Sequence, residues 1–434
     1  MTLMEHHKKP ALKLEPPTVA PQVPIFPQSP PKNPFISPFA SASPTIPGRG
    51  EVVLSLLSPS IPTISTLSYK YPLKLLTRTP ATTLNSKYPE SATTPVHLYL
   101  LTYGGGLLPG DHIEVSITQK PRTRLVVTTP QGSTKIYRTE GRKESHGARD
   151  AKEQSRSCDQ TPSACKSRQI LDVQLGSHSA LCYLPEPSQP FANSQYEQTQ
   201  YFTLLQDRLM DETANQTDKN NLNQSPSLCV LDWVSQGRAA RGEDWSFHSW
   251  KGRNEIWSQD PASGARKLLL RDTVILEDET RHYTEESSCL DSSTTTMLSP
   301  NPHSPPISLS IPARTHPHGI LGTLILHGPL FSSLSSFIMT EFTSQPRLGG
   351  RNWSSSAATS TPASANSTRD SSVLWTAARI RSNFVLVKFG ARDFESAKEW
   401  LGGLMRREGS LVDEFGTEAL GSTSIIQLSS QSLN

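Results

Sequence analysis

The chain has 434 residues and a formal net charge of +3, from 42 basic and 39 acidic residues. This near balance argues against electrostatic binding to nucleic acid, and no apolar run approaches the roughly 20 residues that span a bilayer. Only 35% of the residues are hydrophobic, 36 are proline, and the mean hydropathy is −0.43. We therefore expect one large core that carries long polar inserts.

The first segment, residues 1–47, is dominated by proline, serine and threonine. It has no apolar stretch of the kind a secretory signal needs, and its prolines would break the amphipathic helix of a mitochondrial presequence. We predict a disordered extension, with a polyproline-type docking segment as the alternative. The remainder, residues 48–434, is predicted to be one β-rich domain with polar inserts near residues 139–168, 211–227, 285–306 and 348–369.

The ordered sequence has mainly β-type patterns. Residues 48–57 and 66–76 are predicted strands, with Pro72 at an edge or a bend. Residues 98–138 contain three β-type runs separated by turns whose glycines allow sharp bends. Residues 227–235 are apolar on both faces, which is typical of a central strand. Further strands are predicted at residues 170–175, 176–184, 196–205, 245–250, 253–257, 267–276, 319–327, 373–380 and 383–389.

One helix is predicted after the last strand, because apolar residues recur there at a spacing of three to four. These residues are Phe394, Ala397, Trp400, Leu401 and Leu404. Acidic residues lie in its first turn and arginines in its last, which complements the helix dipole. The excess of strands over helices argues against a doubly wound fold.

The cysteines show no CxxC spacing and their number is odd, which argues against a disulfide framework or a structural zinc site. They are Cys158, Cys165, Cys182, Cys229 and Cys289. Cys182 and Cys229 lie within β-type runs and are predicted to be buried small apolar residues. The pattern fits a reducing compartment, and we expect a cytoplasmic protein.

Few motifs point to catalysis. The glycines Gly104-Gly-Gly106 and Gly110 lack Walker spacing, and Gly132-Ser-Thr-Lys135 has the wrong order for a phosphate loop, so we predict a structural turn. No GxSxG nucleophile elbow is present. The pair His316-Pro-His318 could touch a metal ion or could form part of a surface loop, and both interpretations remain open.

Two carboxylates have a more specific setting. Asp111 follows Gly110, and Glu243 follows Gly242, so each acid lies at the mouth of a turn. A solvated turn residue is one interpretation of each. The other is that both acids line a polar passage.

Four motifs together resemble the urease accessory protein UreD family, called UreH in some bacteria. They occur in the family's order, as Tyr103-Gly-Gly-Gly-Leu-Leu-Pro-Gly-Asp111, Thr128-Thr-Pro-Gln-Gly-Ser-Thr-Lys-Ile-Tyr-Arg138, Tyr183-Leu-Pro-Glu-Pro187 and Gly237-Arg-Ala-Ala-Arg-Gly-Glu243. The Pro-rich leader and polar inserts resemble eukaryotic, fungus-like members. Residues 191–196 depart from the family's usual choices.

The resemblance implies a β-helix-like stack of strands with about two helices, enclosing a polar tunnel. It also implies a protein that is not an enzyme, binds the urease apoprotein, and recruits accessory protein F and accessory protein G, a GTPase. No tightly bound cofactor is implied. Ni²⁺ would be a transient cargo that passes toward the urease active site.

On this basis we predict that Asp111 and Glu243 contact Ni²⁺ briefly along the passage. The predicted passage wall or partner surface comprises Gly105, Gly110, Thr129, Lys135, Tyr137, Arg138, Gly237, Arg238 and Gly242. Two alternatives remain. One is a β-scaffold adaptor that conducts no ion, and the other is a hydrolase with Asp111 and Glu243 as an acid/base pair, for which the sequence offers no ordered nucleophile.

Overall fold

A computed structural model describes residues 46–57, 61–78, 94–130, 134–138, 166–205, 225–277, 310–345, 373–381 and 383–421. All of these belong to one compact unit, Thr45–Asn434. Residues 1–45 of the predicted extension, and nearly all of the four predicted inserts, lie outside the described residues. Two insert boundaries reach described residues, because Ser167, Arg168 and Ser227 belong to strands.

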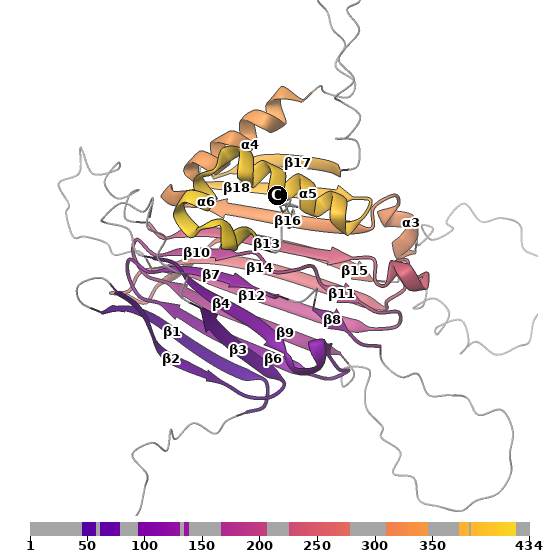
Figure 1. Cartoon of the computed structure of the whole chain (residues 1–434), viewed down its shortest axis with the longest axis horizontal. Helices are drawn as coiled ribbons and strands as arrows, with labels where there is room; N and C mark the ends of the chain where they lie inside the picture. Colours follow the sequence, from indigo (N-terminus) through magenta and orange to yellow (C-terminus); the bar gives the residue numbers. More distant parts are fainter. Residues whose placement is uncertain are drawn as a thin grey trace, which may run out of the picture. The chain divides into compact units, whose positions relative to one another are not determined.

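The chain winds through three sheets in successive turns of a parallel β-helix (Figure 1). Each strand pairs in parallel with the strand that occupies the same sheet one turn earlier. The first turn comprises β4 (Val96–Thr102), β5 (Gly106–Leu107) and β6 (His112–Gln119), and the second comprises β7 (Arg124–Thr128), β8 (Lys135–Ile136) and β9 (Ser167–Leu175). The third comprises β10 (Ala180–Tyr183), β11 (Gln189–Pro190) and β12 (Gln195–Leu205). The chain then continues through β13 (Ser227–Ser235) and β14 (Ser249–Gln259). The mainly β, β-helix-like fold predicted from the sequence is confirmed.

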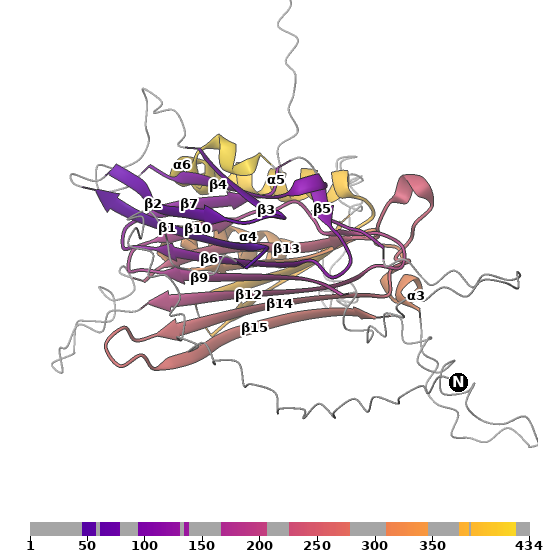
Figure 2. The same ribbon diagram turned by 90° about the horizontal axis from the view of Figure 1, so that it is seen from below.

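Further strands extend the two larger sheets at both ends. The seven-stranded sheet runs in the order β15-β14-β12-β9-β6-β1-β2, which Figure 2 shows edge to edge. The eight-stranded sheet runs in the order β17-β18-β16-β13-β10-β7-β4-β3. The added strands are β1 (Arg49–Leu57), β2 (Ile61–Tyr69), β3 (Leu73–Arg78), β15 (Arg266–Glu277), β16 (Ile320–His327), β17 (Val373–Ile380) and β18 (Phe384–Ala391).

Some predicted strands have different boundaries in the structure. Residues 66–76 do not form one strand: they end β2, turn through Pro72, and begin β3 in the other large sheet. Proline cannot donate a ladder hydrogen bond, so the chain changes sheet there. Residues 245–250 are mostly a turn, because Trp245 has a left-handed φ of 51°, and residues 253–257 belong to the longer β14.

Two hydrophobic cores lie on the two faces of the eight-stranded sheet. One fills the space between the large sheets. The other lies beneath α4 (Ser332–Ser344), α5 (Phe394–Glu408) and α6 (Ser410–Phe415), which cover the outer face (Figure 1). All nine residues of β13 are buried because this strand faces both cores, which confirms the predicted central strand.

The predicted helix corresponds to α5, and the Asp393 side chain caps it by accepting a 2.8 Å hydrogen bond from Ser396 N. Helix α4 was not located from the sequence, although Leu334 and Ile338 are buried one turn apart. In the described ranges α4 and α5 are the two long helices, and α3 (Ile311–Thr315) and α6 are short. None of the described helices is long and apolar enough to cross a membrane.

A pair of glycine substitutions tests this packing. A Cβ at Gly322 would lie 2.2 Å from the Phe389 ring, whereas a Cβ at Gly403 in α5 meets nothing within 4 Å. We expect Gly322→Ala to destabilise the fold by about 1–3 kcal/mol through overpacking. Gly403→Ala should stabilise it by about 0.5–1 kcal/mol, because alanine favours the helix. Urea unfolding measures both changes, and equal midpoints for the two variants would contradict this description.

Candidate functional site

The four sequence motifs meet at the small third sheet, which has the order β11-β8-β5. Tyr137 Oη donates a 3.1 Å hydrogen bond to Gly104 O, and its ring meets Phe191 edge-on with centroids 5.3 Å apart. The Arg238 guanidinium lies 3.9 Å from the centroid of the same Phe191 ring, and Arg238 pairs with Glu243. Residues from successive turns therefore form a continuous line of contacts, to which the unusual tract at residues 191–196 contributes its phenylalanine.

The Glu243 carboxylate stabilises the loop in which it lies, between Gly237 and Glu243. Its carboxylate accepts hydrogen bonds of 2.9 Å from both the backbone N and the Nε of Arg238, and only 9% of the residue is exposed. Gly237 and Gly242 have φ values of 109° and 75°, a left-handed geometry that favours glycine. Burial pushes the pKa of Glu243 upward, but hydrogen bonds from Arg238 and from the Ala192 backbone lower the pKa below its ordinary value.

Asp111 likewise stabilises the turn in which it lies. Its Oδ2 accepts a 2.8 Å hydrogen bond from Leu108 N, and its N–H donates to Leu108 O at 3.0 Å. Gly110, with φ 85°, allows this turn to close. Asp111 precedes β6 and Glu243 precedes β14, which lie three strand positions apart in the seven-stranded sheet.

The structure therefore does not bring the two predicted acids together. Three strand spacings correspond to roughly 14 Å. Paired carboxylates in glycoside hydrolases lie about 5–10 Å apart, so the hydrolase alternative gains no support from this geometry.

The other predicted site residues border the third sheet. Thr129 Oγ1 accepts a 2.7 Å hydrogen bond from Glu186 N, which ties two of the motifs together. Lys135 lies in β8, and Arg138 is exposed. Gly105 is exposed with φ 73°.

The two histidines of the Pro-separated pair differ in their surroundings. His316 is exposed, whereas His318 is half-buried and its ring packs 2.8 Å from the position that a Cβ on Gly390 would take. Within the described ranges, no group of three or more His, Cys, Asp or Glu side chains is arranged to hold a metal ion.

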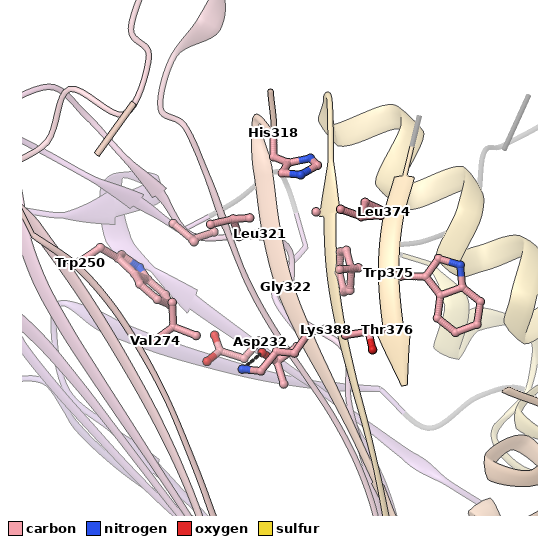
Figure 3. Close-up of a pocket in the computed structure, with 14 residues that line it drawn as sticks. Asp232, Trp250, Val274, His318, Leu321, Gly322, Leu374, Trp375, Thr376 and Lys388 are labelled. Atoms are coloured by element: carbon pink, nitrogen blue, oxygen red, sulfur yellow. Dashed lines mark hydrogen bonds between the residues drawn. The ribbon is translucent and has the colours of Figure 1, made fainter. Parts of the chain in front are cut away.

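A cavity of about 460 Å³ lies between the two large sheets near β15 and β17, and sequence reasoning did not anticipate it (Figure 3). Trp250, Val274, Leu321 and Leu374 give it apolar walls. Four of its polar groups, Asp232, Thr323, Thr376 and Lys388, come from neighbouring strands of the eight-stranded sheet, and a fifth, His318, comes from the turn before β16.

Asp232 is the buried acid of this cavity, with 5% of the residue exposed. Its Oδ1 accepts a 3.1 Å hydrogen bond from Gln198 Nε2, and its Oδ2 accepts a 2.8 Å hydrogen bond from Asn254 Nδ2. A Cβ at Gly252 would lie 3.1 Å from Asp232 Oδ2, so glycine lets β14 pass close to the carboxylate.

Burial raises the pKa of the Asp232 carboxyl above its ordinary value. The hydrogen bond from Asn254 opposes that rise, and the charge of Asp272 adds to it. Lys388 lowers the same pKa because its ammonium group favours the ionised carboxylate.

Polar side chains continue from Asp232 along the axis of the β-helix. Gln169 and Gln198 are register partners on β9 and β12, and Gln200 and Asn254 are register partners on β12 and β14. All are buried. We call these four residues, together with Asp232 and Asp272, the interior polar row.

Among the atoms of the interior polar row that have no protein partner in the described structure are Gln169 Oε1 and Asn254 Oδ1. Buried polar atoms are almost always hydrogen-bonded, so these two oxygens need a partner that the described protein groups do not supply. Beyond Gln169, Ser167 Oγ donates a 2.8 Å hydrogen bond to Leu108 O in the turn that Asp111 closes. The polar groups thus extend from the cavity toward that turn.

The sequence does contain a signal for this site. Asp232 is the one charged residue in a strand of nine buried residues, and an acid at such a position needs partners. Gln198 and Gln200 alternate along β12, which places both on its buried face.

Comparison with known proteins supplies the family context. The model of the UreD urease accessory protein family matches residues 53–207 and 213–418. An uncharacterized urease accessory protein ureD-like of Schizosaccharomyces pombe is 29% identical over 344 residues, or 79% of this chain and 89% of that protein. Urease accessory protein 4 of Cryptococcus neoformans var. grubii is 31% identical over 298 residues, or 67% and 73%. Urease accessory protein D of Arabidopsis thaliana is 33% identical over 208 residues, or 48% and 53%.

The pairing of Glu243 with Arg238 should make stability depend on pH. We expect Glu243→Gln to lose about 1–2 kcal/mol of unfolding free energy at neutral pH, because several donors lose a charged acceptor. The folded-state pKa lies below the ordinary 4.5. The stabilisation is therefore complete above about 4.5 and is lost as the pH falls through the folded-state pKa.

Urea unfolding at neutral pH and at about pH 3 measures this difference, with the exposed neighbour substitution Asp244→Asn as the control. A deficit of the same size at both pH values would contradict the assigned role of the Glu243 carboxylate.

Proposed function

Since the chain belongs to the UreD urease accessory protein family and its role therefore lies in urease maturation, we propose that it passes Ni²⁺ through its β-helix to the urease apoprotein. The observation that carries this proposal is the interior polar row, with the buried carboxylate of Asp232 at its centre. A packed β-helix has no structural need for a buried acid, since apolar residues of similar size would fill the space at lower cost.

The chemistry of the interior polar row suits an ion in transit. Ni²⁺ must meet oxygen or nitrogen donors that release it again, whereas clustered thiolates would retain it. The interior polar row offers amides and carboxylates. The buried cysteines Cys182 and Cys229 lie in the other core, beneath the helices, so the ion would not meet them on this route.

The predicted acids would act at the borders of this route rather than at its centre. Asp111 lies in the turn next to Ser167, and Glu243 lies in the loop that Arg238 clamps. The surface around the third sheet, from Gly104 to Arg238, is the proposed docking face for urease or for accessory proteins F and G. We propose that this assembly forms in the cytoplasm.

The adaptor alternative remains a distinct proposal. An adaptor needs the exposed residues that border the third sheet, such as Arg138 and Gly105, and makes no use of an acid between the sheets. A substitution that closes the interior without touching the surface separates the two functions.

Asp232→Leu is such a substitution. We expect nickel in urease to fall several-fold when this variant replaces the natural protein, because leucine is apolar and offers no ligand to the ion. Asp232→Asn, which retains the volume, should give a smaller loss. The measurement is metal analysis of urease after maturation with accessory proteins F and G, together with co-purification of the complex.

The control is Glu51→Gln, an exposed acid on β1, and thermal unfolding checks that each variant folds. The leucine leaves the amides of Gln198 and Asn254 without an acceptor, so some destabilisation, about 1–3 kcal/mol, is expected. A folded Asp232→Leu protein that assembles and loads urease normally would favour the adaptor.

The border acids have their own test. Asp111→Ala and Glu243→Ala should each lower nickel loading while complex assembly persists, because each removes one carboxylate near an end of the route. The matched control is Asp244→Ala, which removes an exposed acid beside Glu243. Unchanged loading in Asp111→Ala or Glu243→Ala would remove that residue from the route.

A further inference from the structure

Lys388 places a positive charge at the mouth of the cavity that contains Asp232. Its Nζ lies 2.6 Å from Asp272 Oδ1 and 2.7 Å from Asp272 Oδ2. It also donates a 2.8 Å hydrogen bond to Thr323 Oγ1. The ammonium group therefore already contacts three oxygen atoms of the protein, and Figure 3 shows Lys388 among the residues that line the cavity.

More oxygen atoms face the same place. Thr323 lies between Asp232 and Lys388 in the strand register, and Lys388 is close enough to lower the pKa of Asp232. On the facing sheet, Asn254 is the register partner of Asp272. Asn254 is 1% exposed, and its Oδ1 has no protein partner in the described structure. Two carboxylates, a hydroxyl and an amide oxygen thus occupy neighbouring register positions around Lys388, and such a donor set suits hard divalent cations.

We propose that these groups form a divalent-cation site that Lys388 occupies as a tethered plug, and that an incoming cation binds by displacing the lysine side chain. The inference rests on the proposed conduction of Ni²⁺ for its purpose in maturation. The site itself is a property of the isolated chain.

The exposure of the two partners supports displacement rather than a fixed ion pair. The Lys388 side chain is 36% exposed, whereas that of Asp272 is 11% exposed. The lysine stem is flexible and its ammonium is strongly hydrated, so the amine can move into solvent while the carboxylates stay in place.

The local charge balance gives the plug a function. Asp272 raises the pKa of Asp232 and Lys388 lowers it, because a second negative charge disfavours the ionised carboxylate and a nearby positive charge favours it. The lysine supplies one charge and a divalent cation supplies two. Because the lysine fills the site when no metal ion is bound, an abundant cation must displace the lysine before it can bind. The site therefore exists before the ion arrives, and the ion replaces the lysine.

Substitution of the plug tests the proposal on the purified full chain. Lys388→Met keeps the length of the stem and removes the charge. We expect this variant to bind one Ni²⁺ at least about tenfold more tightly than the natural chain in equilibrium dialysis, because the repulsion between the ammonium and the entering ion is gone. The double substitution Lys388→Met with Asp272→Asn should lose that gain.

The matched control is Lys251→Met. Lys251 forms an ion pair with Glu277 at 2.6 Å outside the cavity. Both variants keep every histidine of the chain, so any binding of Ni²⁺ by histidine is the same in both. Equal Ni²⁺ affinity in Lys388→Met and the natural chain would overturn the inference and leave Lys388 as a structural counter-ion. A gain that persists in the double variant would also overturn it, because the ion would be binding elsewhere.

These results are separable from those on conduction. Metal binding is measured without urease, whereas conduction is judged by nickel loading in the Asp232 variants. Tighter binding in Lys388→Met supports the plug even where Asp232→Leu loads urease normally, an outcome that would reject conduction alone.

Discussion

Parallel register is the constraint on which this structure depends. Each turn of the β-helix places its strand about 4.8 Å from the previous one, with inner residues opposite inner residues. A polar side chain repeated at one inner position therefore becomes a continuous row. Gln169 and Gln198 are neighbours for this reason, although 29 positions separate them in the numbering. The interior polar row is a consequence of winding, not of any local motif.

The same register separates two kinds of chemistry. The eight-stranded sheet presents Asp232 to the space between the sheets, and on the same strand it presents Cys229 to the core under the helices. Successive side chains of a strand point to opposite faces of the sheet, so the side chains of Asp232 and Cys229 point in opposite directions. A soft thiol and a hard carboxylate can thus lie three residues apart without sharing a ligand. The helices α4 and α5 cover the thiol face, so the sheet can be polar on one side and closed on the other.

The sequence predicted the strands, the helix at α5 and the central position of β13 because each depends on a local pattern of burial. It did not predict that residues 66–76 divide between two sheets, since turn geometry at Pro72 decides this. The site was harder to predict because it, too, depends on geometry that no local sequence pattern encodes. Asp111 and Glu243 stand out in the sequence because glycine turns precede them, yet each carboxylate accepts hydrogen bonds within its own turn. Asp232 has no such turn, and its partners Gln198 and Asn254 come from other strands.

A buried carboxylate also limits what can surround it. Burial raises the pKa of Asp232 and the charge of Asp272 raises it further, whereas the ammonium group of Lys388 lowers it. Lys388 supplies this positive charge while it remains partly exposed. A fixed arginine with a bidentate grip would bind the acids more rigidly. Under the proposed plug, the flexible and hydrated amine of a lysine at this position lets the acids stay paired at rest and become available when an ion enters.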